Sequence, residues 1–187
     1  MLPGFHRSLF VRALRTCSVV VLVFAPSVVI AGQQPLPATD AQRQAMERLA
    51  FLVGRWSGPV TVVLGPGEPL HLTQTENVEF KLDGLVLLIE GESTDADGKA
   101  RFQALATVAY DEASHAYHFR AYNEGRYLDK ELTVVPDGFA WGFNSGPAHI
   151  QNTMHLTAKG EWQETTDVAF GGNPPRRSVE MLLQHQP

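Results

Sequence analysis

The sequence predicts an all-β protein: an antiparallel up-and-down β-barrel of about eight to ten strands with one short N-terminal helix. Three observations support this fold class. Glycine, proline, asparagine and aspartate recur at short intervals after Gly54, and few gaps between them are long enough for a helix. The segments between these turns are rich in Val, Thr, Phe, Tyr and Leu, which favour strands. Several of these segments also alternate apolar and polar residues, as a half-buried strand does.

The predicted helix lies just before these turns. Thr39 is a suitable capping residue, and Gln42 follows it at the spacing of a capping box. Apolar residues then recur at helical spacing from Met46 to Leu52. Gly54 is expected to end the helix, because glycine adopts the left-handed conformation of a helix terminus without steric cost.

The predicted strands are joined by tight turns, which is typical of a meander. The clearest alternation places Leu72, Val78 and Phe80 on one face of their segment. A long meander with one apolar face must bury that face and protect its edges, and closure into a barrel does both. A two-sheet sandwich is the alternative fold. The ten predicted strands are Val60 to Leu64, Leu70 to Leu82, Leu85 to Ser93, Ala100 to Asp111, His115 to Asn123, Arg126 to Val135, Phe139 to Phe143, His149 to Leu156, Trp162 to Phe170 and Ser178 to His185.

The first 31 residues have the order of a secretory signal peptide. Three arginines and no acidic residue precede or flank an apolar run from Cys17 to Pro26, and Val29 and Ala31 suit a cleavage site after Ala31. The run is shorter than the roughly 20 apolar residues that cross a bilayer, so no stable membrane span is expected after cleavage. We therefore predict a signal peptide at residues 1–31, a flexible linker at 32–38 and a barrel domain at 39–187, in a periplasmic or secreted protein.

Charge and cysteine content exclude several classes of function. Without residues 1–31 the chain holds 12 Lys and Arg against 20 Asp and Glu, a net charge of −8. Such a balance disfavours nucleic acid as a partner, because phosphates are bound by basic surfaces. The single cysteine, Cys17, belongs to the predicted signal peptide. The mature chain is therefore expected to have no disulfide, no thiolate metal site and no cysteine nucleophile.

A short motif at the junction of helix and meander carries a family resemblance. Gly54-Arg55-Trp56 lies directly after the helix, and the calycin superfamily carries such a Gly-x-Trp on its first strand. In more detail the chain is similar to a bacterial family of lipocalin-like, haem-binding-like barrel proteins, distant relatives of nitrobindin. The matching pieces are Phe51 to Gly58, Val108 to Asp111 with Tyr117, Gly160-Glu161-Trp162 and Val179 to Leu183. The resemblance implies a barrel whose Trp56 packs across the closed end.

The strand from His115 to Asn123 offers two arrangements, since successive side chains point to opposite faces. His118, Arg120 and Tyr122 would form a carboxylate-binding strip if they pointed inward. If instead Tyr117 and Phe119 point inward, Arg120 is an outer charge. The cost of burying an unpaired charge favours the second arrangement, and both stay open at this point.

Two acidic residues are further candidates for a ligand site. Glu76 falls within the apolar alternation of its segment together with Gln74, so it would point into the barrel, with an inward Arg120 as its partner. A bulge that turns Glu76 outward is the alternative. Glu90 lies in a segment that is apolar on both faces, and its direction is open. The predicted ligand-binding residues are Trp56, Glu76, Glu90, His118, Arg120 and Tyr122.

The function predicted from these features is the binding of a small apolar or amphipathic molecule inside the barrel. One alternative is a haem-binding barrel, which the resemblance to nitrobindin implies, although none of the histidines stands in a matching local motif. A second alternative is a small acid-base enzyme that uses Glu76 or Glu90 with His118. No Gly-x-Ser-x-Gly motif, metal site or other cofactor site is predicted, and the chain is expected not to be an enzyme. A homodimer is left open.

Overall fold

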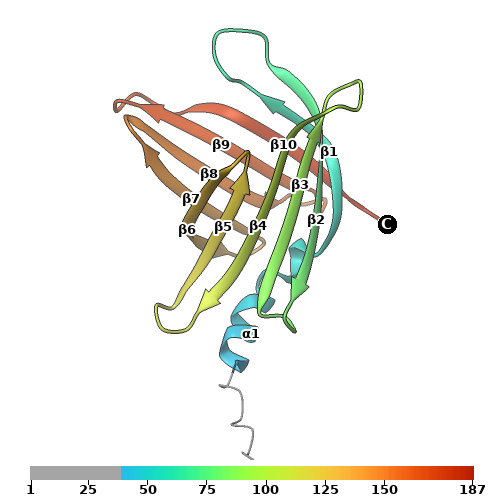
Figure 1. Cartoon of the computed structure of the whole chain (residues 1–187), viewed down its shortest axis with the longest axis vertical. Helices are drawn as coiled ribbons and strands as arrows, with labels where there is room; N and C mark the ends of the chain where they lie inside the picture. The colour runs from blue at the N-terminus through green and yellow to red at the C-terminus, as the bar shows by residue number, and fades with distance from the viewer. Residues whose placement is uncertain (1–38) are drawn as a thin grey trace, which may run out of the picture. The chain divides into compact units, whose positions relative to one another are not determined.

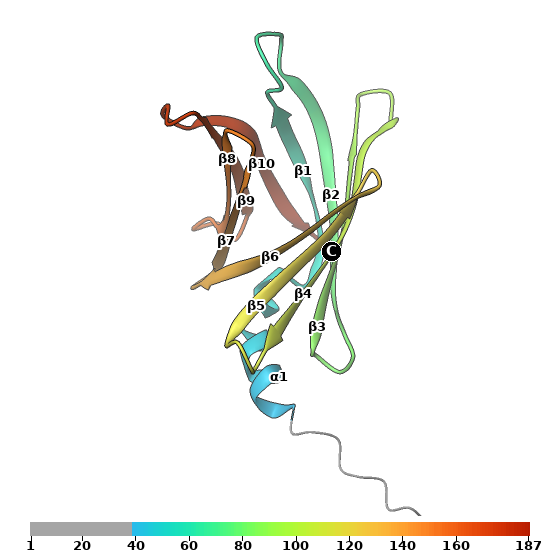
Figure 2. The same cartoon turned by 60° about the vertical axis from the view of Figure 1, so that its left-hand side comes forward.

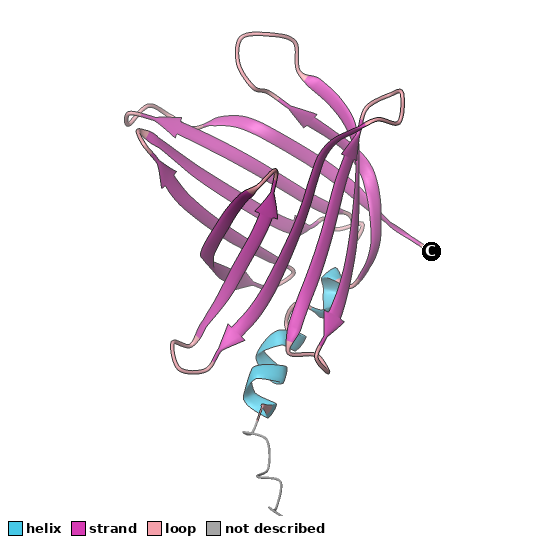
Figure 3. Ribbon diagram, viewed as in Figure 1, coloured by secondary structure: helices cyan, strands magenta, loops and turns pink. Residues whose placement is uncertain are grey.

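The barrel and its helix are described by a computed structural model over residues 39–187, which comprises almost all of one compact unit, Leu36–Pro187. The predicted signal peptide and linker lie outside the described residues. Helix α1 (Asp40–Glu47) and a short 3-10 helix η1 (Ala50–Leu52) precede ten strands (Figures 1 and 3). The strands are β1 (Gly54–Val62), β2 (Leu70–Lys81), β3 (Val86–Thr94), β4 (Ala100–Asp111), β5 (Ala116–Asn123), β6 (Arg126–Val135), β7 (Gly138–Ser145), β8 (Ala148–Leu156), β9 (Trp162–Phe170) and β10 (Arg176–Gln186).

The strands form a closed antiparallel barrel, which confirms the predicted fold class. Each strand pairs with its neighbours in the sequence, and β10 returns to pair with β1. Tight turns make this possible: between β5 and β6, Glu124 and Gly125 both have positive φ, as a two-residue hairpin of type I′ requires. Because β1 and β10 pair with each other, neither the first nor the last strand is left as an edge of an open sheet. The sandwich alternative is therefore wrong.

The largest difference from the predicted strands is at β1. The predicted strand began at Val60, whereas β1 begins at Gly54. The helix is correspondingly shorter, because α1 ends at Glu47 and η1 completes the segment. Gly54 therefore starts a strand and does not end the helix. Its φ of +131° suits glycine, and an added Cβ would collide with His185.

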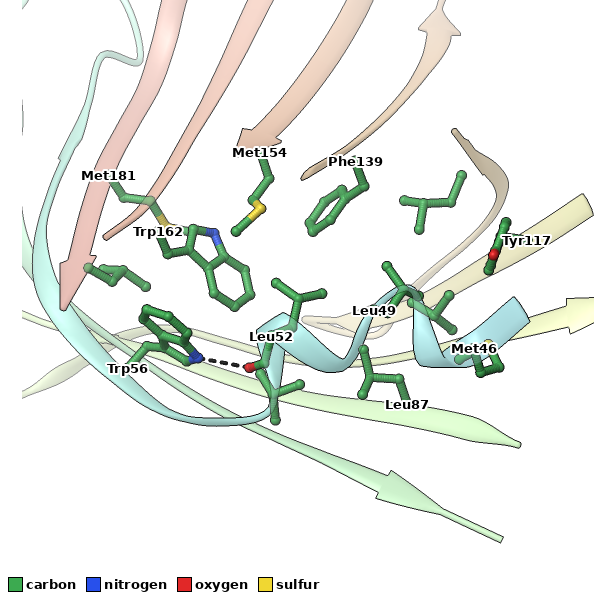
Figure 4. Packing of buried hydrophobic residues seen from close by; sticks show 14 of the residues in the cluster. Met46, Leu49, Leu52, Trp56, Leu87, Tyr117, Phe139, Met154, Trp162 and Met181 are labelled. Atoms are coloured by element: carbon green, nitrogen blue, oxygen red, sulfur yellow. Dashed lines mark hydrogen bonds between the residues drawn. The ribbon is translucent and has the colours of Figure 1, made fainter. Parts of the chain in front are cut away.

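One end of the barrel is closed by the helical segment. Met46, Leu49 and Leu52 are at most 1% exposed and pack among side chains from the barrel wall (Figure 4). Trp56 is 3% exposed, and its indole Nε1 donates a hydrogen bond of 2.8 Å to the Leu52 carbonyl. The Tyr117 hydroxyl donates a bond of 2.7 Å to the Ala45 carbonyl and ties α1 to β5. The core therefore lies at this end.

One seam of the barrel is much less paired than the others. Strands β6 and β7 pair through only three residue pairs, from Thr133 with Ala140 to Val135 with Gly138. By contrast, β7 and β8 pair through eight. Figure 2 shows β6 and β7 meeting at the turn that joins them and separating beyond it. More than half of each strand thus has no backbone partner across this seam.

Candidate functional site in the barrel interior

Two carboxyl groups point into the barrel, one from β2 and one from β9. Side chains of directly paired residues on antiparallel strands lie on the same face. Glu76 is paired with the buried Trp56, and it therefore faces inward. Glu164 is paired with Met154 on one side and Met181 on the other, both buried, and faces inward as well.

Glu76 belongs to a small polar network. The Gln74 side-chain amide donates a hydrogen bond of 2.7 Å to Glu76 Oε1, and the Ser93 hydroxyl donates to the Gln74 side-chain oxygen. Gln74 and Ser93 are each 4% exposed. Gly91 is paired with Glu76, and a Cβ at this position would lie 2.8 Å from both carboxyl oxygens. The absence of a side chain at Gly91 therefore leaves the space that the Glu76 carboxyl occupies.

Glu164 accepts hydrogen bonds from its own neighbours, and a nearby acceptor, Asn152 Oδ1, has no hydrogen-bond partner. The indole Nε1 of Trp162 donates a hydrogen bond of 2.8 Å to Glu164 Oε2, and the Asn152 side chain also bonds this carboxyl group. Asn152 Nδ2 further donates to the Thr166 hydroxyl at 3.1 Å. Asn152 is 5% exposed, and its Oδ1 is the one buried side-chain atom without a hydrogen-bond partner among the described residues. Such an atom costs about 1–3 kcal/mol unless something binds it.

The barrel interior favours the protonated forms of both acids. Burial is the main cause that raises the pKa of Glu76 to about 8; the nearby Glu164 acts in the same direction, and the bond from Gln74 opposes the shift. Burial likewise raises the pKa of Glu164, against the effect of the bonds from Trp162 and Asn152. Both shifts have the same main cause, because a low-dielectric interior disfavours a charged carboxylate. At neutral pH the pair therefore retains at least one proton.

Above the packed end, the inner wall is aromatic and accessible to solvent. The ring of Trp141 stacks with those of Phe119 and Phe143, with centroids 5.1 Å and 6.0 Å apart. These three residues are only partly buried, although Phe119 shares the inner face with buried Val108, and Trp141 shares it with buried Asn152. These inward-facing rings therefore keep part of their surface accessible to solvent, above the end that α1 and η1 close.

The structure brings only two of the six predicted residues to the inner wall, Trp56 and Glu76. The bulge considered for Glu76 does not occur, since its pairing with Trp56 and Gly91 is regular. Trp56 packs at the closed end, as the resemblance implied. The predicted partnership of Glu76 with Arg120 is wrong, because Arg120 points outward.

His118, Arg120 and Tyr122 all lie on the outer face of β5, so the inward carboxylate-binding strip is also wrong. Arg120 Nε lies 3.0 Å from Asp129 Oδ2, and Tyr127 donates to the same oxygen at 2.9 Å. Tyr117 and Phe119 take the inner face instead. This outcome agrees with the cost of burying a guanidinium: outside, Arg120 keeps both water and an ion-pair partner.

Glu90 faces outward too, and its carboxylate accepts a bond of 3.4 Å from Asn77. Together with Tyr122 it lines a broad outer groove of about 630 Å³ that crosses β1 to β5. The two faces of β3 are both partly apolar, and for this reason the alternation left the direction of Glu90 open.

The histidines do not fit a haem ligated by histidine inside the barrel. His71, His118, His149 and His155 are on the outer face of their strands, as their pairing with outward residues shows. His115 lies in the turn between β4 and β5. His185 is paired with Trp56 and shares its register, but its ring packs edge-on against Trp56 at the closed end, and the residue is exposed. Within residues 39–187, no cluster of three or more His, Cys, Asp or Glu could hold a metal ion.

The residues proposed for an acid-base enzyme are not assembled, because Glu76 points inward whereas His118 and Glu90 point outward. On the outer face, Ser114 Oγ lies 3.5 Å from His118 Nε2, and His118 Nδ1 lies 3.9 Å from Asp129. These distances are long for a catalytic relay, and the Ser114 hydroxyl donates its proton to Asp111 at 2.9 Å. This cluster is therefore a solvated surface network.

Sequence reasoning missed three residues of the inner wall: Glu164, Asn152 and Lys130. The period of two along a strand was the signal that could have found them. Glu164 follows the buried Trp162 by two residues and therefore shares its face. Asn152 likewise lies two residues from inward Ile150 and from inward Met154. Lys130 is paired with Phe119 and shares its inward face.

The fold and the site together define a closed ten-stranded antiparallel β-barrel protein, with a helical segment across one end and polar groups on its inner wall. Among solved structures the chain is similar to the crystal structure of Rv2717c from M. tuberculosis, with a TM-score of 0.58 and 12% sequence identity. The match covers 76% of this chain and 98% of that one. At this identity the likeness shows the fold alone. No protein-family model and no curated protein matches the sequence.

Proposed function

We propose that the barrel binds a small apolar or amphipathic molecule in its interior. The observation that carries this proposal is the partly exposed aromatic wall formed by Phe119, Trp141 and Phe143 above the sealed end. A hollow lined mainly by apolar side chains, with a few polar groups that fix orientation, is the usual form of a small-molecule site. Here the orienting groups are Glu76, Glu164 and Asn152.

The short pairing of β6 with β7 supports ligand entry at this seam, because few backbone bonds hold the two strands together there. Lys130 on β6 and Trp141 on β7 face inward beside the unpaired part of the seam. At the end opposite α1, the strands are joined by turns, and no helix of the described residues covers them (Figure 1).

Titration with N-phenyl-1-naphthylamine, a neutral apolar probe whose emission rises in apolar surroundings, tests this proposal. We expect saturable binding with a stoichiometry near one. Ala121 lies on the inner face of β5 and is partly exposed, so Ala121→Phe should reduce the affinity several-fold by filling the interior. Leu105→Phe, on the outer face of neighbouring β4, is the matched control and should bind normally. Equal effects of the two substitutions, or no saturable binding, would refute interior binding.

The proposal includes export, for which the support is the basic and then apolar pattern of residues 1–31. In the described residues there is no helix long and apolar enough to span a membrane. The intact mass of protein from its own host is expected to correspond to a chain that starts at Gly32. A mass that retains residues 1–31 would contradict export by signal cleavage.

A further inference from the structure

We propose that the interior ligand is an organic cation, a protonated amine on an apolar body, whose ammonium group binds between Glu76, Glu164 and Asn152 Oδ1. This inference rests on the interior binding proposed above and specifies the class of ligand.

The first argument is the balance of hydrogen-bond donors and acceptors. Three side-chain donors at this site are already engaged: Gln74 Nε2 with Glu76, Trp162 Nε1 with Glu164, and Asn152 Nδ2 with Thr166. Once the two acids have ionised, their oxygens and the unpartnered Asn152 Oδ1 are acceptors. An ammonium group has three donors and no acceptor, and it therefore complements the site.

The second argument is charge. Glu76 and Glu164 lie close enough for the charge of one to raise the pKa of the other. Within residues 39–187, no Lys or Arg nitrogen lies within 4 Å of either carboxyl group. A bound ammonium would supply the missing counter-charge, and both carboxylates could then form charge-assisted hydrogen bonds.

The third argument is the aromatic surroundings. Trp56 is paired with Glu76, and Trp162 donates to Glu164; their rings meet edge to face with centroids 5.7 Å apart. Aromatic rings near a carboxylate favour a cation, because the ring quadrupole attracts positive charge. Trp56 and Trp162 are themselves buried, so the partly exposed rings of Phe119, Trp141 and Phe143 are the ones that contact the apolar body.

The other titratable groups of the inner wall decide which alternative must be tested. Tyr110 and Tyr117 face inward near the closed end, where the Tyr117 hydroxyl is bonded to Ala45. Lys130 faces inward from β6, and at the open rim the exposed Arg126 and Arg176 share the inward register. An anionic ligand would be drawn to these three cations. The two carboxyl groups and the unpartnered Asn152 Oδ1, which lie deeper in the barrel, favour a cation over an anion.

Binding of the cation releases protons, because the carboxyl groups must ionise to hold it. The pKa of Glu76, about 8 without ligand, sets the pH range over which the affinity changes. Below this pH a proton must leave before the ammonium group binds, so the affinity is expected to rise about tenfold per pH unit between pH 6 and 8 for each proton released. A neutral ligand has no such dependence.

The experiment compares octylammonium, 1-octanol and octanoate, which share one apolar body, by calorimetric titration of the full-length protein. At pH 8 we expect octylammonium to bind at least tenfold more tightly than the other two, with an affinity that increases from pH 6 to 8. Octyltrimethylammonium, a cation without N–H donors, should bind less tightly than octylammonium. Glu76→Gln and Glu164→Gln should each remove most of the preference for octylammonium.

Glu90→Gln, on the outer face, is the matched control and should keep the preference. Glutamine has the shape of protonated glutamic acid, and unchanged near-UV circular dichroism would show that the variants fold. Equal binding of all three compounds would overturn the cation proposal and leave interior binding intact. Tightest binding of octanoate would overturn it in favour of an anion held by Lys130. If none of them binds and the neutral probe fails as well, interior binding itself is wrong.

Discussion

Glu76 is the residue whose chemistry most strongly shapes the interior. Its carboxyl group occupies the space left by Gly91, and the buried Gln74 holds one of its oxygens. Burial and the nearby Glu164 together place its pKa at about 8, whereas an exposed glutamate has 4.5. A glutamate that stays protonated at neutral pH adds no charge and so does not serve solubility. It suits a site that releases a proton when a ligand binds.

The raised pKa of Glu76 predicts the pH dependence of stability. The folded chain holds this proton more tightly than the unfolded chain, so the stabilisation is complete below about pH 4.5 and is lost as the pH rises to about 8. The loss should be on the order of 2–3 kcal/mol, after allowance for solvent that reaches the interior. Urea unfolding of the ligand-free protein at pH 5 and 8.5 measures it.

Glu76→Gln removes the titrating group and should flatten this profile. We expect the variant to match the wild type at pH 5 and to exceed it in stability at pH 8.5, with a remaining slope that comes from Glu164, whose pKa is also raised. Glu90→Gln is the control and should leave the profile unchanged. Identical profiles for Glu76→Gln and the wild type would show that Glu76 is not buried as described.

For single residues, the sequence left Glu76 open between an inward position and a bulge that turns it outward. The alternation along β2 raised the inward position, and the regular pairing in the structure decides for it. That Glu164 lies within range of Glu76 could not be predicted, because β2 and β9 are far apart in the sequence and are not neighbours in the barrel. The directions of His118, Arg120 and Tyr122 depended on which face of β5 met the interior, and this was settled by the pairing of Tyr117 and Phe119 with inward partners.

Among the elements, the helical segment has the clearest structural role. It seals one end of the barrel through Leu49 and Leu52, which meet Trp56 and the ends of the strands (Figure 4). Its helical spacing was visible in the sequence. The break between α1 and η1 was not, since it follows from the need to bring Leu52 beneath the Trp56 indole, a tertiary contact.

Leu49→Ala should therefore destabilise the protein by about 2–5 kcal/mol, because Leu49 is fully buried and its removal leaves a cavity. Leu182→Ala is the control: this residue is 36% exposed on the outer face of β10, and its loss should cost less than about 1 kcal/mol. Chemical unfolding of both variants gives the comparison. Similar losses at the two sites would mean that the helical segment does not seal the barrel.

The β6–β7 seam is the element most suited to movement. Its three residue pairs leave the Arg126 to Leu132 part of β6 and the Trp141 to Ser145 part of β7 without a partner across the seam. Backbone amides that face the seam in these parts should exchange with solvent deuterons much faster than amides of β3 and β4, which are paired on both sides. Equal protection of the two regions in hydrogen-exchange NMR would contradict the short pairing at this seam.

For the whole molecule, the sequence predicted closure because a long meander with one apolar face has few other ways to bury that face and protect its edges. All ten predicted strands occur, with ends displaced by several residues at β1 and by fewer elsewhere. The short pairing of β6 with β7 was beyond prediction, because it depends on how far two neighbouring strands remain in register.

The central claim, that a small molecule occupies the interior, is tested most directly by the tryptophans. The chain has three, Trp56, Trp141 and Trp162, and all lie on the inner wall. An octyl ligand that carries a terminal bromine, as the amine or the alcohol, should quench their fluorescence to saturation with one ligand per chain. The unbrominated ligand should reverse the quenching by competition. Saturable binding that leaves the tryptophan emission unchanged would place the ligand on the outer face and contradict the claim.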